Sequence, residues 1–455
     1  MGGTAKVRAA AAALALLAAV AAGASGCSDG GHQGAHRGSG HGSGGAQRNG
    51  SGPTGKRGAA VHVDRADALA DRKVHIRIDG LRPHQAVTVE SHATDHTGAP
   101  WGARGRYRAD AHGAVDLDRQ APRGGRPYRG ADSMGLLTAM LPHGGPSARQ
   151  VGSGKAFSYH PGSLARHRTF QVELAVRDGG GHRLGERSLT RRWLARGVRT
   201  RRLTVRKDRL DGRLFVPSAA VRGGKRRAPV LVFGGSEGGH AGEYAAALLA
   251  SHGHPAISLC YFKCGRGSQR PGAINMIDLG YFTRAVKTLD EQPGADARRA
   301  AVMGNSRGSE PAQLLGQRHP RLVRNVLAYA PSAQVNGPYL AGTSGRAAWA
   351  EHGRPIPAGP IRLNRVSGIV LAVAGSNDKM WGSARAAGVI AGQHNAHGHP
   401  HRRLTYAGAG HHVNWFPYGQ PGQDGGADGR TAATSRADQA ARQQGWPQVL
   451  RLLDH

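Results

Sequence analysis

The sequence predicts two folded units, an all-β sandwich followed by an α/β unit that has a mostly parallel sheet with helices on both faces. From residue 61 to 200, apolar residues alternate with polar ones, as they do in strands that are buried on one side only. From residue 201 to 455, short continuous apolar runs alternate with helix-like segments, which is typical of a buried parallel sheet. The 455 residues suffice for both units at roughly 150 residues per domain.

The first unit is expected to be an antiparallel, immunoglobulin-like sandwich of about seven strands. Apolar residues at every second position mark its strands: Val74, Ile76, Ile78, Val87, Val89, Val115, Leu117, Phe170, Val172, Leu174 and Val176. Turn signals such as Asp79-Gly80 and His112-Gly113 separate the strands, and no amphipathic helix intervenes. The unit contains no cluster of residues typical of an active site, so we expect it to have a structural or positioning role.

The second unit contains six apolar runs that we expect to form strands: Pro229–Gly234, Pro255–Phe262, Ala300–Met303, Leu322–Ala330, Ile369–Ala374 and Arg403–Tyr406. Helices are expected at Glu243–Ser251, Leu279–Leu289, Pro311–Arg318, Ala384–Gln393 and Ala432–Leu453. We expect Gly445 and Pro447 to break or kink the last of these helices. Residues 332–362 are rich in Gly and Pro, and we expect this insertion to lie over the carboxyl ends of the strands, where ligands bind in such sheets.

The amino-terminal segment is typical of an exported protein. Lys6 and Arg8 precede the apolar run Ala9–Ala22, which is shorter than the roughly 20 residues of a membrane span and suits the core of a signal peptide. Residues 1–26 are therefore predicted to be a signal peptide.

Two cleavage positions are compatible with this segment. Ala24-Ser25-Gly26-Cys27 resembles the bacterial lipobox, in which Cys27 is lipidated, and ordinary cleavage after Ala24 is the alternative. Residues 27–60 are mostly Gly, Ser, His and Arg, so we expect a disordered tether. The predicted location is the outer face of the cell membrane, through a lipid anchor, or the medium if the protein is secreted.

The basic composition does not predict a nucleic-acid partner. Lys and Arg number 62 against 29 Asp and Glu, which gives a formal net charge of +33. These residues are spread along the chain without interleaved aromatic residues, unlike those of a nucleic-acid groove. If Cys27 carries a lipid, Cys260 and Cys264 remain, and they form a disulfide or stay as two thiols. A C-x3-C pair without nearby paired His is poor evidence for zinc, so we predict no metal and no cofactor.

A G-x-S-x-G motif, Gly304-Asn305-Ser306-Arg307-Gly308, separates an expected strand from an expected helix. In that context the serine occupies a tight turn, and the two glycines prevent clashes with the neighbouring strand and helix. A chain with 71 glycines also produces such a motif by chance, so further residues are needed to support a catalytic interpretation.

An acid and a base follow the serine in the expected places. Asp378 comes directly after the run Ile369–Ala374, and His411 follows Arg403–Tyr406 after small residues that let the backbone turn. The order Ser, Asp, His along the chain is that of an α/β-hydrolase triad. We therefore predict Ser306 as the nucleophile, Asp378 as the acid that orients the base, and His411 as the base, with His412 as its rival.

The oxyanion of an acyl-transfer reaction needs two fixed N–H donors. One is expected from Arg307, the residue after the nucleophile, and the other from the glycine-rich loop that follows the first long strand. Within that loop we favour Gly235, with Ser236 second. Such a loop also cradles phosphate in other proteins, but the pattern G-x-x-x-x-G-K-[ST] is missing from the sequence.

Six segments together resemble the acyl-CoA thioesterase / bile acid-CoA:amino acid N-acyltransferase family: Tyr128–Leu137, Val232–Gly239, Leu279–Phe282, Gly304–Glu310, Gly375–Ser383 and Gly408–His411. The resemblance spans residues 65 to 455 and implies a β-sandwich joined to an α/β-hydrolase domain. It also implies Ser306, Asp378 and His411 as the catalytic residues. Family members with Cys as the nucleophile include the amino-acid transferases, so the serine favours water as the acyl acceptor.

We therefore expect a serine hydrolase of acyl thioesters or esters that acts through an acyl-enzyme intermediate, and the resemblance implies acyl-CoA as a substrate. Because CoA thioesters are intracellular, the predicted export also favours an exported carboxylesterase that acts on non-CoA esters. An acyl-CoA N-acyltransferase and a surface-binding lipoprotein with a silent hydrolase domain remain as competing interpretations. The expected partners are a small-molecule acyl (thio)ester and, through the lipid anchor, the membrane.

Overall fold

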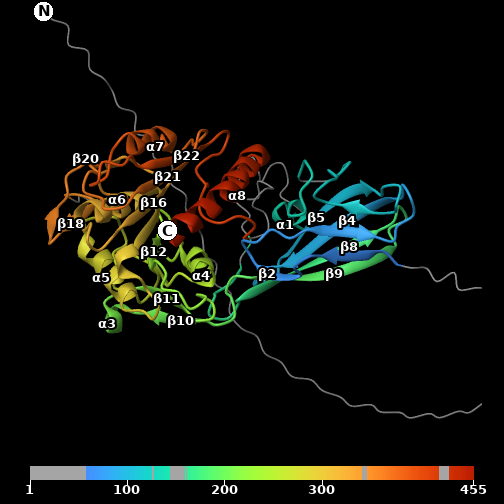
Figure 1. Cartoon of the computed structure of the whole chain (residues 1–455), viewed down its shortest axis with the longest axis horizontal. Coiled ribbons are helices and arrows are strands. Elements are labelled where there is room, and N and C mark those ends of the chain that lie inside the picture. The colour runs from blue at the N-terminus through green and yellow to red at the C-terminus, as the bar shows by residue number, and fades with distance from the viewer. Residues whose placement is uncertain (1–57, 125–127, 144–158, 160, 341–345, 420–429) are drawn as a thin grey trace, which may run out of the picture. The chain divides into compact units, whose positions relative to one another are not determined.

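The computed structural model describes residues 58–124, 128–143, 159, 161–340, 346–419 and 430–455 (Figure 1). The predicted signal peptide, Cys27 and residues 27–57 of the predicted tether lie outside the described residues. Within the described ranges, no helix is both long and apolar enough to cross a membrane.

The described residues of the first folded region form two small sheets and one short helix. The sheet orders are β2-β9-β8-β4-β5-β7 and β1-β3-β6, and all recorded pairs are antiparallel except β2 with β9. The elements are β1 (Ala60–Val63), β2 (Asp67–Leu69), β3 (Ile76–Asp79), β4 (Ala86–Thr94), β5 (Pro100–Arg108), β6 (Val115–Asp116), α1 (Gly135–Thr138), β7 (Leu141–Pro142), β8 (Thr169–Arg177) and β9 (Arg183–Arg192).

The alternation that predicts these strands is confirmed by their burial. In β3, Ile76 and Ile78 are buried while Arg77 between them is exposed, and β8 shows the same pattern over its first half. The described residues form nine strands here rather than about seven. The additional strands β2 and β7 are three and two residues long, too short to show an alternating pattern.

The second region is built on one eight-stranded sheet with the order β10-β11-β13-β12-β15-β16-β21-β22. Its strands are β10 (Val198–Leu203), β11 (Gly212–Pro217), β12 (Val230–Phe233), β13 (Ala256–Leu259), β15 (Ala301–Asn305), β16 (Asn325–Tyr329), β21 (Val370–Gly375) and β22 (Arg402–Tyr406). The last six match the six predicted strands and pair in parallel. The sequence pattern did not reveal the antiparallel β10 and β11, and β10 runs through residue 200.

Helices cover both faces of this sheet, as the α/β prediction requires. They are α3 (Val205–Asp208), α4 (Glu243–Ser251), α5 (Leu279–Asp290), η1 (Ala297–Arg299), η2 (Ser306–Gly308), α6 (Ser309–Arg318), α7 (Ser383–Ala391) and α8 (Ala432–Asp454). Successive residues of β12 belong to two hydrophobic clusters on opposite faces of the sheet. Val230 and Val232 belong to the cluster that includes α4 and α8, whereas Leu231 and Phe233 belong to the cluster that includes α5, α6 and α7. This two-sided burial explains why the strands are continuous apolar runs.

The last helix differs from its prediction, because α8 continues through both Gly445 and Pro447. A Cβ atom at Gly445 would lie 3.2 Å from the hydroxyl of Tyr406 in β22, so the glycine permits close packing of the helix on the sheet. The buried side chains of Trp446 and Val449 hold the helix against the same core on either side of the proline. Tertiary packing therefore overrides the local preference of these two residues.

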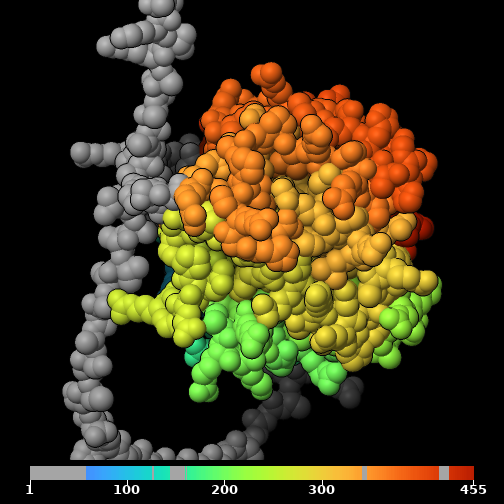
Figure 2. Space-filling model, turned by 90° about the vertical axis from the view of Figure 1, so that its left-hand side faces the viewer, coloured from blue at the N-terminus to red at the C-terminus, as the bar shows by residue number. Residues whose placement is uncertain are grey.

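The described part of residues 332–362 contains four short strands: β17 (Gln334–Val335), β18 (Trp349–Glu351), β19 (Arg354–Pro355) and β20 (Gly359–Pro360). β17 pairs with β20, and β18 lies between β14 (Ile277–Asp278) and β19. Figure 2 shows the orange atoms of this segment in the middle of one face of the α/β region. The structure also settles the state of the two cysteines after β13, since Cys260 and Cys264 form a disulfide with their Cα atoms 5.7 Å apart.

Candidate active site

Ser306 lies on a sharp turn between β15 and α6, at the carboxyl end of its strand. Its φ angle is +54°, a left-handed conformation that is uncommon for residues other than glycine. A Cβ atom at Gly304 would lie 2.2 Å from the Gly308 carbonyl oxygen, and one at Gly308 would lie 2.1 Å from the Gly234 carbonyl oxygen. Both glycines of the motif are therefore required by close backbone contacts, as in the strained turn that carries a nucleophilic serine.

Asp378 and His411 meet at the ends of the two neighbouring strands β21 and β22. The Nδ1 atom of His411 lies 2.8 Å from Oδ2 of Asp378, and the same oxygen accepts a hydrogen bond of 2.6 Å from the hydroxyl of Ser383. Burial alone would raise the pKa of Asp378, but the hydrogen bonds from His411 and Ser383 outweigh it and hold the pKa below its ordinary value. The carboxylate is thus ionised at neutral pH and fixes the ring so that Nε2 remains for another partner.

The loop that carries His411 is held from two sides. A Cβ atom at Gly375, the last residue of β21, would lie 2.2 Å from the carbonyl oxygens of Ala409 and Gly410, so this glycine lets the loop approach the strand. On the other side the amide of Gly410 donates a hydrogen bond of 2.6 Å to the buried carboxylate of Asp438 on α8. Asp438 was not predicted from the sequence, because no local pattern connects it with a loop 28 residues earlier.

The structure distinguishes the two candidate bases. His411 is buried and contacts Asp378, whereas the neighbouring His412 is exposed and its ring stands edge-on to that of His411, with centroids 6.0 Å apart. Ser306, Asp378 and His411 all follow parallel strands of one sheet, so they lie at the same edge. Among the described residues no hydrogen bond between Ser306 and His411 is recorded, and such contacts commonly tighten only when substrate binds.

The glycine-rich loop after β12 lies directly against the nucleophile. A Cβ atom at Gly235 would lie 2.7 Å from Cβ of Ser306, so only glycine fits there. The amide of Gly235, our first choice as the second oxyanion donor, donates a hydrogen bond of 2.9 Å to the carboxylate of Glu237. This carboxylate did not stand out in the sequence. The amide of Ser236, our second choice, has no recorded acceptor in the described part of the chain.

The side chain of Arg307 connects the nucleophile turn to the insertion at residues 332–362. Its guanidinium group lies 3.0 Å from the buried carboxylate of Glu310 and donates a hydrogen bond of 2.7 Å to the carbonyl oxygen of Gly337. Glu310 in turn accepts hydrogen bonds from Asn336, at 2.7 Å, and from the indole of Trp349, at 2.8 Å. The expectation that the insertion lies at the carboxyl ends of the strands is confirmed by these contacts.

In the described residues, no group of three His, Cys, Asp or Glu side chains is arranged to hold a metal ion.

A parallel sheet with helices on both faces, a serine on a strained strand-to-helix turn, and a hydrogen-bonded Asp-His pair after later strands define the α/β-hydrolase class. Residues 71–205 match the family model described as the acyl-CoA thioester hydrolase/BAAT N-terminal region. Among curated proteins, the chain is 29% identical over 383 residues to a peroxisomal succinyl-coenzyme A thioesterase of Mus musculus, covering 76% of this chain and 84% of that one. It is 36% identical over 264 residues to acyl-coenzyme A thioesterase 3 of Mus musculus, covering 57% and 55%. By these matches the chain is similar to acyl-coenzyme A thioesterases, and its amino-terminal unit is similar to the N-terminal region of the acyl-CoA thioester hydrolase/BAAT family.

The chain spans about half the length of acyl-coenzyme A thioesterase 3 and of several further acyl-coenzyme A thioesterases of mouse and rat. Solved structures with detectable similarity include MGS-M1, an α/β hydrolase enzyme from a deep-sea metagenome library, at 14% identity and a TM-score of 0.39 over 57% of this chain and 100% of that one. An esterase of Pyrobaculum calidifontis aligns at 16% identity with a TM-score of 0.35, over 54% of this chain and 85% of that one.

Proposed function

We propose that the protein hydrolyses acyl thioesters, with acyl-CoA as the first candidate substrate, through Ser306, His411 and Asp378. The observation that carries this proposal is the hydrogen bond of 2.8 Å between His411 Nδ1 and Asp378 Oδ2, at the same sheet edge as the strained turn of Ser306. The names of the curated relatives, which are acyl-coenzyme A thioesterases, support the choice of substrate class.

The proposed reaction has two halves. In the first, the hydroxyl oxygen of Ser306 attacks the thioester carbonyl carbon while His411 Nε2 takes the hydroxyl proton, and Asp378 stabilises the imidazolium that forms. The C–S bond then breaks, and the thiolate receives the proton from His411. In the second half, His411 removes a proton from water and the resulting hydroxide attacks the carbonyl carbon of the acyl-enzyme. The C–O bond to Ser306 then breaks, the serine oxygen takes the proton from His411, and the carboxylic acid is released.

The oxyanion of each half-reaction is assigned to backbone N–H donors. The amide of Arg307 is one donor, and the amide of Ser236 is the better second donor because Glu237 occupies the amide of Gly235. The ion pair between Arg307 and Glu310 fixes the turn from which the first donor projects. Preorganised donors of this kind contribute roughly 10²- to 10³-fold each to turnover.

A groove beside the proposed base suits an acyl chain. The ring of Trp381 lies edge-on to His411, with centroids 6.1 Å apart, and its indole N–H is fixed by the carbonyl oxygen of Ala330. Trp381 lines a cavity of about 500 Å³ together with Pro331, Pro360, Ala386 and the half-exposed Val389. Ser332, Gln334, Asn336 and Arg385 add polar groups to the same walls, and apolar walls that carry some polar groups are typical of sites for small organic ligands.

The proposal is tested by turnover of an acyl-CoA thioester and of an oxygen ester with the same acyl length. Ser306→Ala serves as the blank, and circular dichroism verifies that it folds. We expect the thioester to be preferred in kcat/KM and Ser306→Ala to be inactive on both substrates. A preference for the oxygen ester would favour an exported carboxylesterase, and full activity of Ser306→Ala would overturn the assignment of the nucleophile.

An N-acyltransferase and a silent hydrolase domain are recognised in the same assay. If acyl-CoA is consumed only when an amine is present, and an amide is recovered, the protein is an N-acyltransferase. If neither ester nor amine acceptor supports turnover, while the folded protein binds to surfaces, the hydrolase domain is silent.

We further propose that the enzyme is exported and anchored through a lipid on Cys27. This rests on the apolar run Ala9–Ala22 and the lipobox-like residues before Cys27. Expression of the full chain in a bacterium, followed by fractionation, is expected to place it with the membrane, and Cys27→Ser is expected to release it. Cytoplasmic recovery of the unmodified chain would contradict the proposal.

A further inference from the structure

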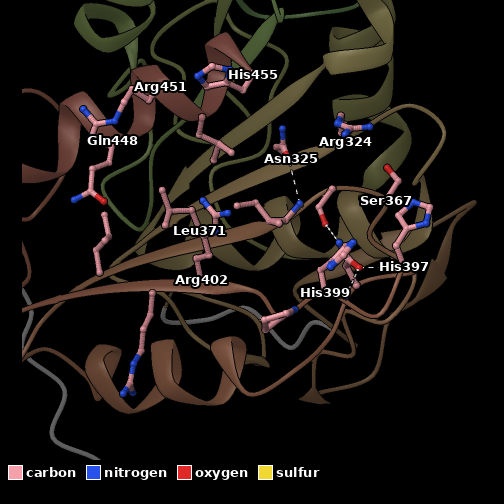
Figure 3. A pocket seen from close by; sticks show the side chains of 17 residues that line it. Arg324, Asn325, Ser367, Leu371, His397, His399, Arg402, Gln448, Arg451 and His455 are labelled. Atoms are coloured by element: carbon pink, nitrogen blue, oxygen red, sulfur yellow. Dashed lines mark hydrogen bonds between the residues drawn. The ribbon is translucent and has the colours of Figure 1, made fainter.

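A second cavity lies at the edge of the sheet that is opposite to Ser306. It has a volume of about 1080 Å³ and is lined by the beginnings of β16, β21 and β22 and by the last turns of α8 (Figure 3). Leu371, in this cavity, is the second residue of β21, whereas Asp378 lies in the loop after the last residue of that strand, Gly375. At about 3.3 Å per residue the strand alone places roughly 13 Å between Leu371 and that loop, so a ligand here would not contact the reacting atoms.

The cavity is basic. Its basic residues come from the start of β16, from the segment that leads into β22, from β22 itself and from α8: Arg324, Arg402, Arg403, Arg451, His397, His399 and His455. Among the described residues that line it, none is Asp or Glu. Asp454, next to His455, is paired with Arg227 and lies 3.6 Å from His254, so it does not neutralise the cavity. In the part of the chain that the structure describes, no ion pair is recorded for the four arginines.

Arginine is abundant in this chain, so a cluster of arginines is not by itself evidence of a binding site. The walls of this cavity, however, are held in place by hydrogen bonds. The buried Asn395 accepts hydrogen bonds from the amides of His397 and His399, at 2.9 and 3.0 Å, and donates one of 2.7 Å to the carbonyl oxygen of Gly368. Across the cavity, Asn325 accepts a hydrogen bond of 3.0 Å from the amide of Ile369. The histidine segment is thus fixed to the start of β21 before any ligand arrives.

The floor between the basic groups is apolar. Ile369, Leu371, Leu404 and Leu452 contribute to the lining, and Figure 3 shows Leu371 beside Arg402 in the middle of the cavity. Arginine binds phosphate with two parallel hydrogen bonds, whereas an apolar floor suits the organic part of a ligand. A small inorganic anion would leave most of this volume and all of this floor unused.

We propose that this cavity binds a phosphate ester, a ligand whose phosphate contacts Arg402 and Arg451 and whose organic part lies on the leucine floor. A soluble nucleotide and the headgroup of an anionic phospholipid both have this chemistry. The proposal does not depend on the esterase or thioesterase activity, because the cavity shares no residue with the active site.

Binding is measured with purified protein at about 0.15 M salt, where the Debye length of about 8 Å screens long-range attraction by the net charge. ADP and inorganic phosphate are titrated calorimetrically, and flotation with phosphatidylcholine vesicles is compared with and without phosphatidylglycerol. The test variant is Arg402→Gln/Arg451→Gln; both residues are exposed, and a melting curve verifies that the variant folds. The control is Arg119→Gln/Arg298→Gln, which removes the same charge from side chains that are 85% and 92% exposed elsewhere.

We expect the test variant to bind ADP or the phosphatidylglycerol vesicles at least about tenfold more weakly than the wild type, because it loses one or more hydrogen bonds from a charged group. The affinity of the control variant should stay within about twofold of the wild type. Loss for ADP identifies a soluble phosphate ester, and loss for phosphatidylglycerol vesicles identifies a headgroup. Equal loss in both variants would show that net charge alone is responsible and would overturn the proposal, as would a failure of ADP and the vesicles to bind at all. Binding of ADP no tighter than inorganic phosphate would overturn the role of the leucine floor.

Discussion

Replacing Asp378 by Asn tests the central claim of the site, that a charged acid holds the base in its working orientation. Asn has nearly the same shape, so the loop after β21 should keep its fold. Its amide can still contact His411 Nδ1, but it carries no charge and offers a donor as well as an acceptor. The ring would therefore lose the negative charge that stabilises its protonated form, and it would be free to present the wrong nitrogen to Ser306.

The expected loss follows from these two effects together. Replacing the aspartate of a Ser-His-Asp site by the neutral amide of asparagine lowers kcat by about 10⁴, which corresponds to about 5.4 kcal/mol of transition-state stabilisation. Ser383 offers a matched control, because its hydroxyl donates to the same Oδ2 atom over 2.6 Å but carries no charge. Ser383→Ala should cost roughly 10- to 100-fold, the value of one hydrogen bond to a charged group.

The assay is single-substrate turnover at neutral pH of whichever ester the wild type prefers, with melting curves of all three proteins to show that they fold. An Asp378→Asn variant within tenfold of the wild type would refute the reasoning, because the hydrogen bond of 2.8 Å would then have no catalytic role. Equal losses in Asp378→Asn and Ser383→Ala would assign the effect to loop packing rather than to charge.

Three further predictions concern the same region. Gly304→Ala should lower the free energy of unfolding, measured in urea, by about 3 kcal/mol, because its Cβ atom would lie 2.2 Å from a carbonyl oxygen. Gly272→Ala is the control and should change this free energy little, because nothing lies within 4 Å of a Cβ atom there. Equal effects of the two substitutions would contradict the close contact at Gly304. His411→Ala should reduce turnover by roughly 10⁴-fold or more and His412→Ala by less than about tenfold, and the reverse order would move the base by one residue. The pKa of Asp378 is lowered in the folded chain, so its ionised form stabilises the fold at pH values above the unfolded-state pKa of roughly 3.9. The difference in free energy of unfolding between the wild type and Asp378→Asn should therefore shrink as the pH falls below that value. A constant difference in urea titrations down to about pH 3 would exclude this linkage.

Much of the α/β region could be predicted because two-sided burial leaves a strong mark on the sequence. The helix predicted at Glu243–Ser251 has those bounds in the structure, and each of the six predicted strands is present. The strand β10 was missed because only its first and last residues, Val198 and Leu203, are buried, so it contains no apolar run. The continuity of α8 through Pro447 was missed because it depends on packing against β22 and not on local preference.

The candidate site divides along similar lines. The chain order of Ser306, Asp378 and His411 predicted the Asp-His contact, since residues after neighbouring parallel strands share a sheet edge. The contact of Glu237 with the amide of Gly235 was not predictable, because the direction of a loop side chain is not encoded in spacing.

The hydrogen bond from Gly410 to Asp438 gives the last helix an influence on turnover that its distance from the chemistry would not suggest. Local opening of α8 at Asp438 would remove this anchor from the backbone before His411, so the position of the base depends on the stability of the helix. Amide exchange at Gly410 should therefore follow that of α8.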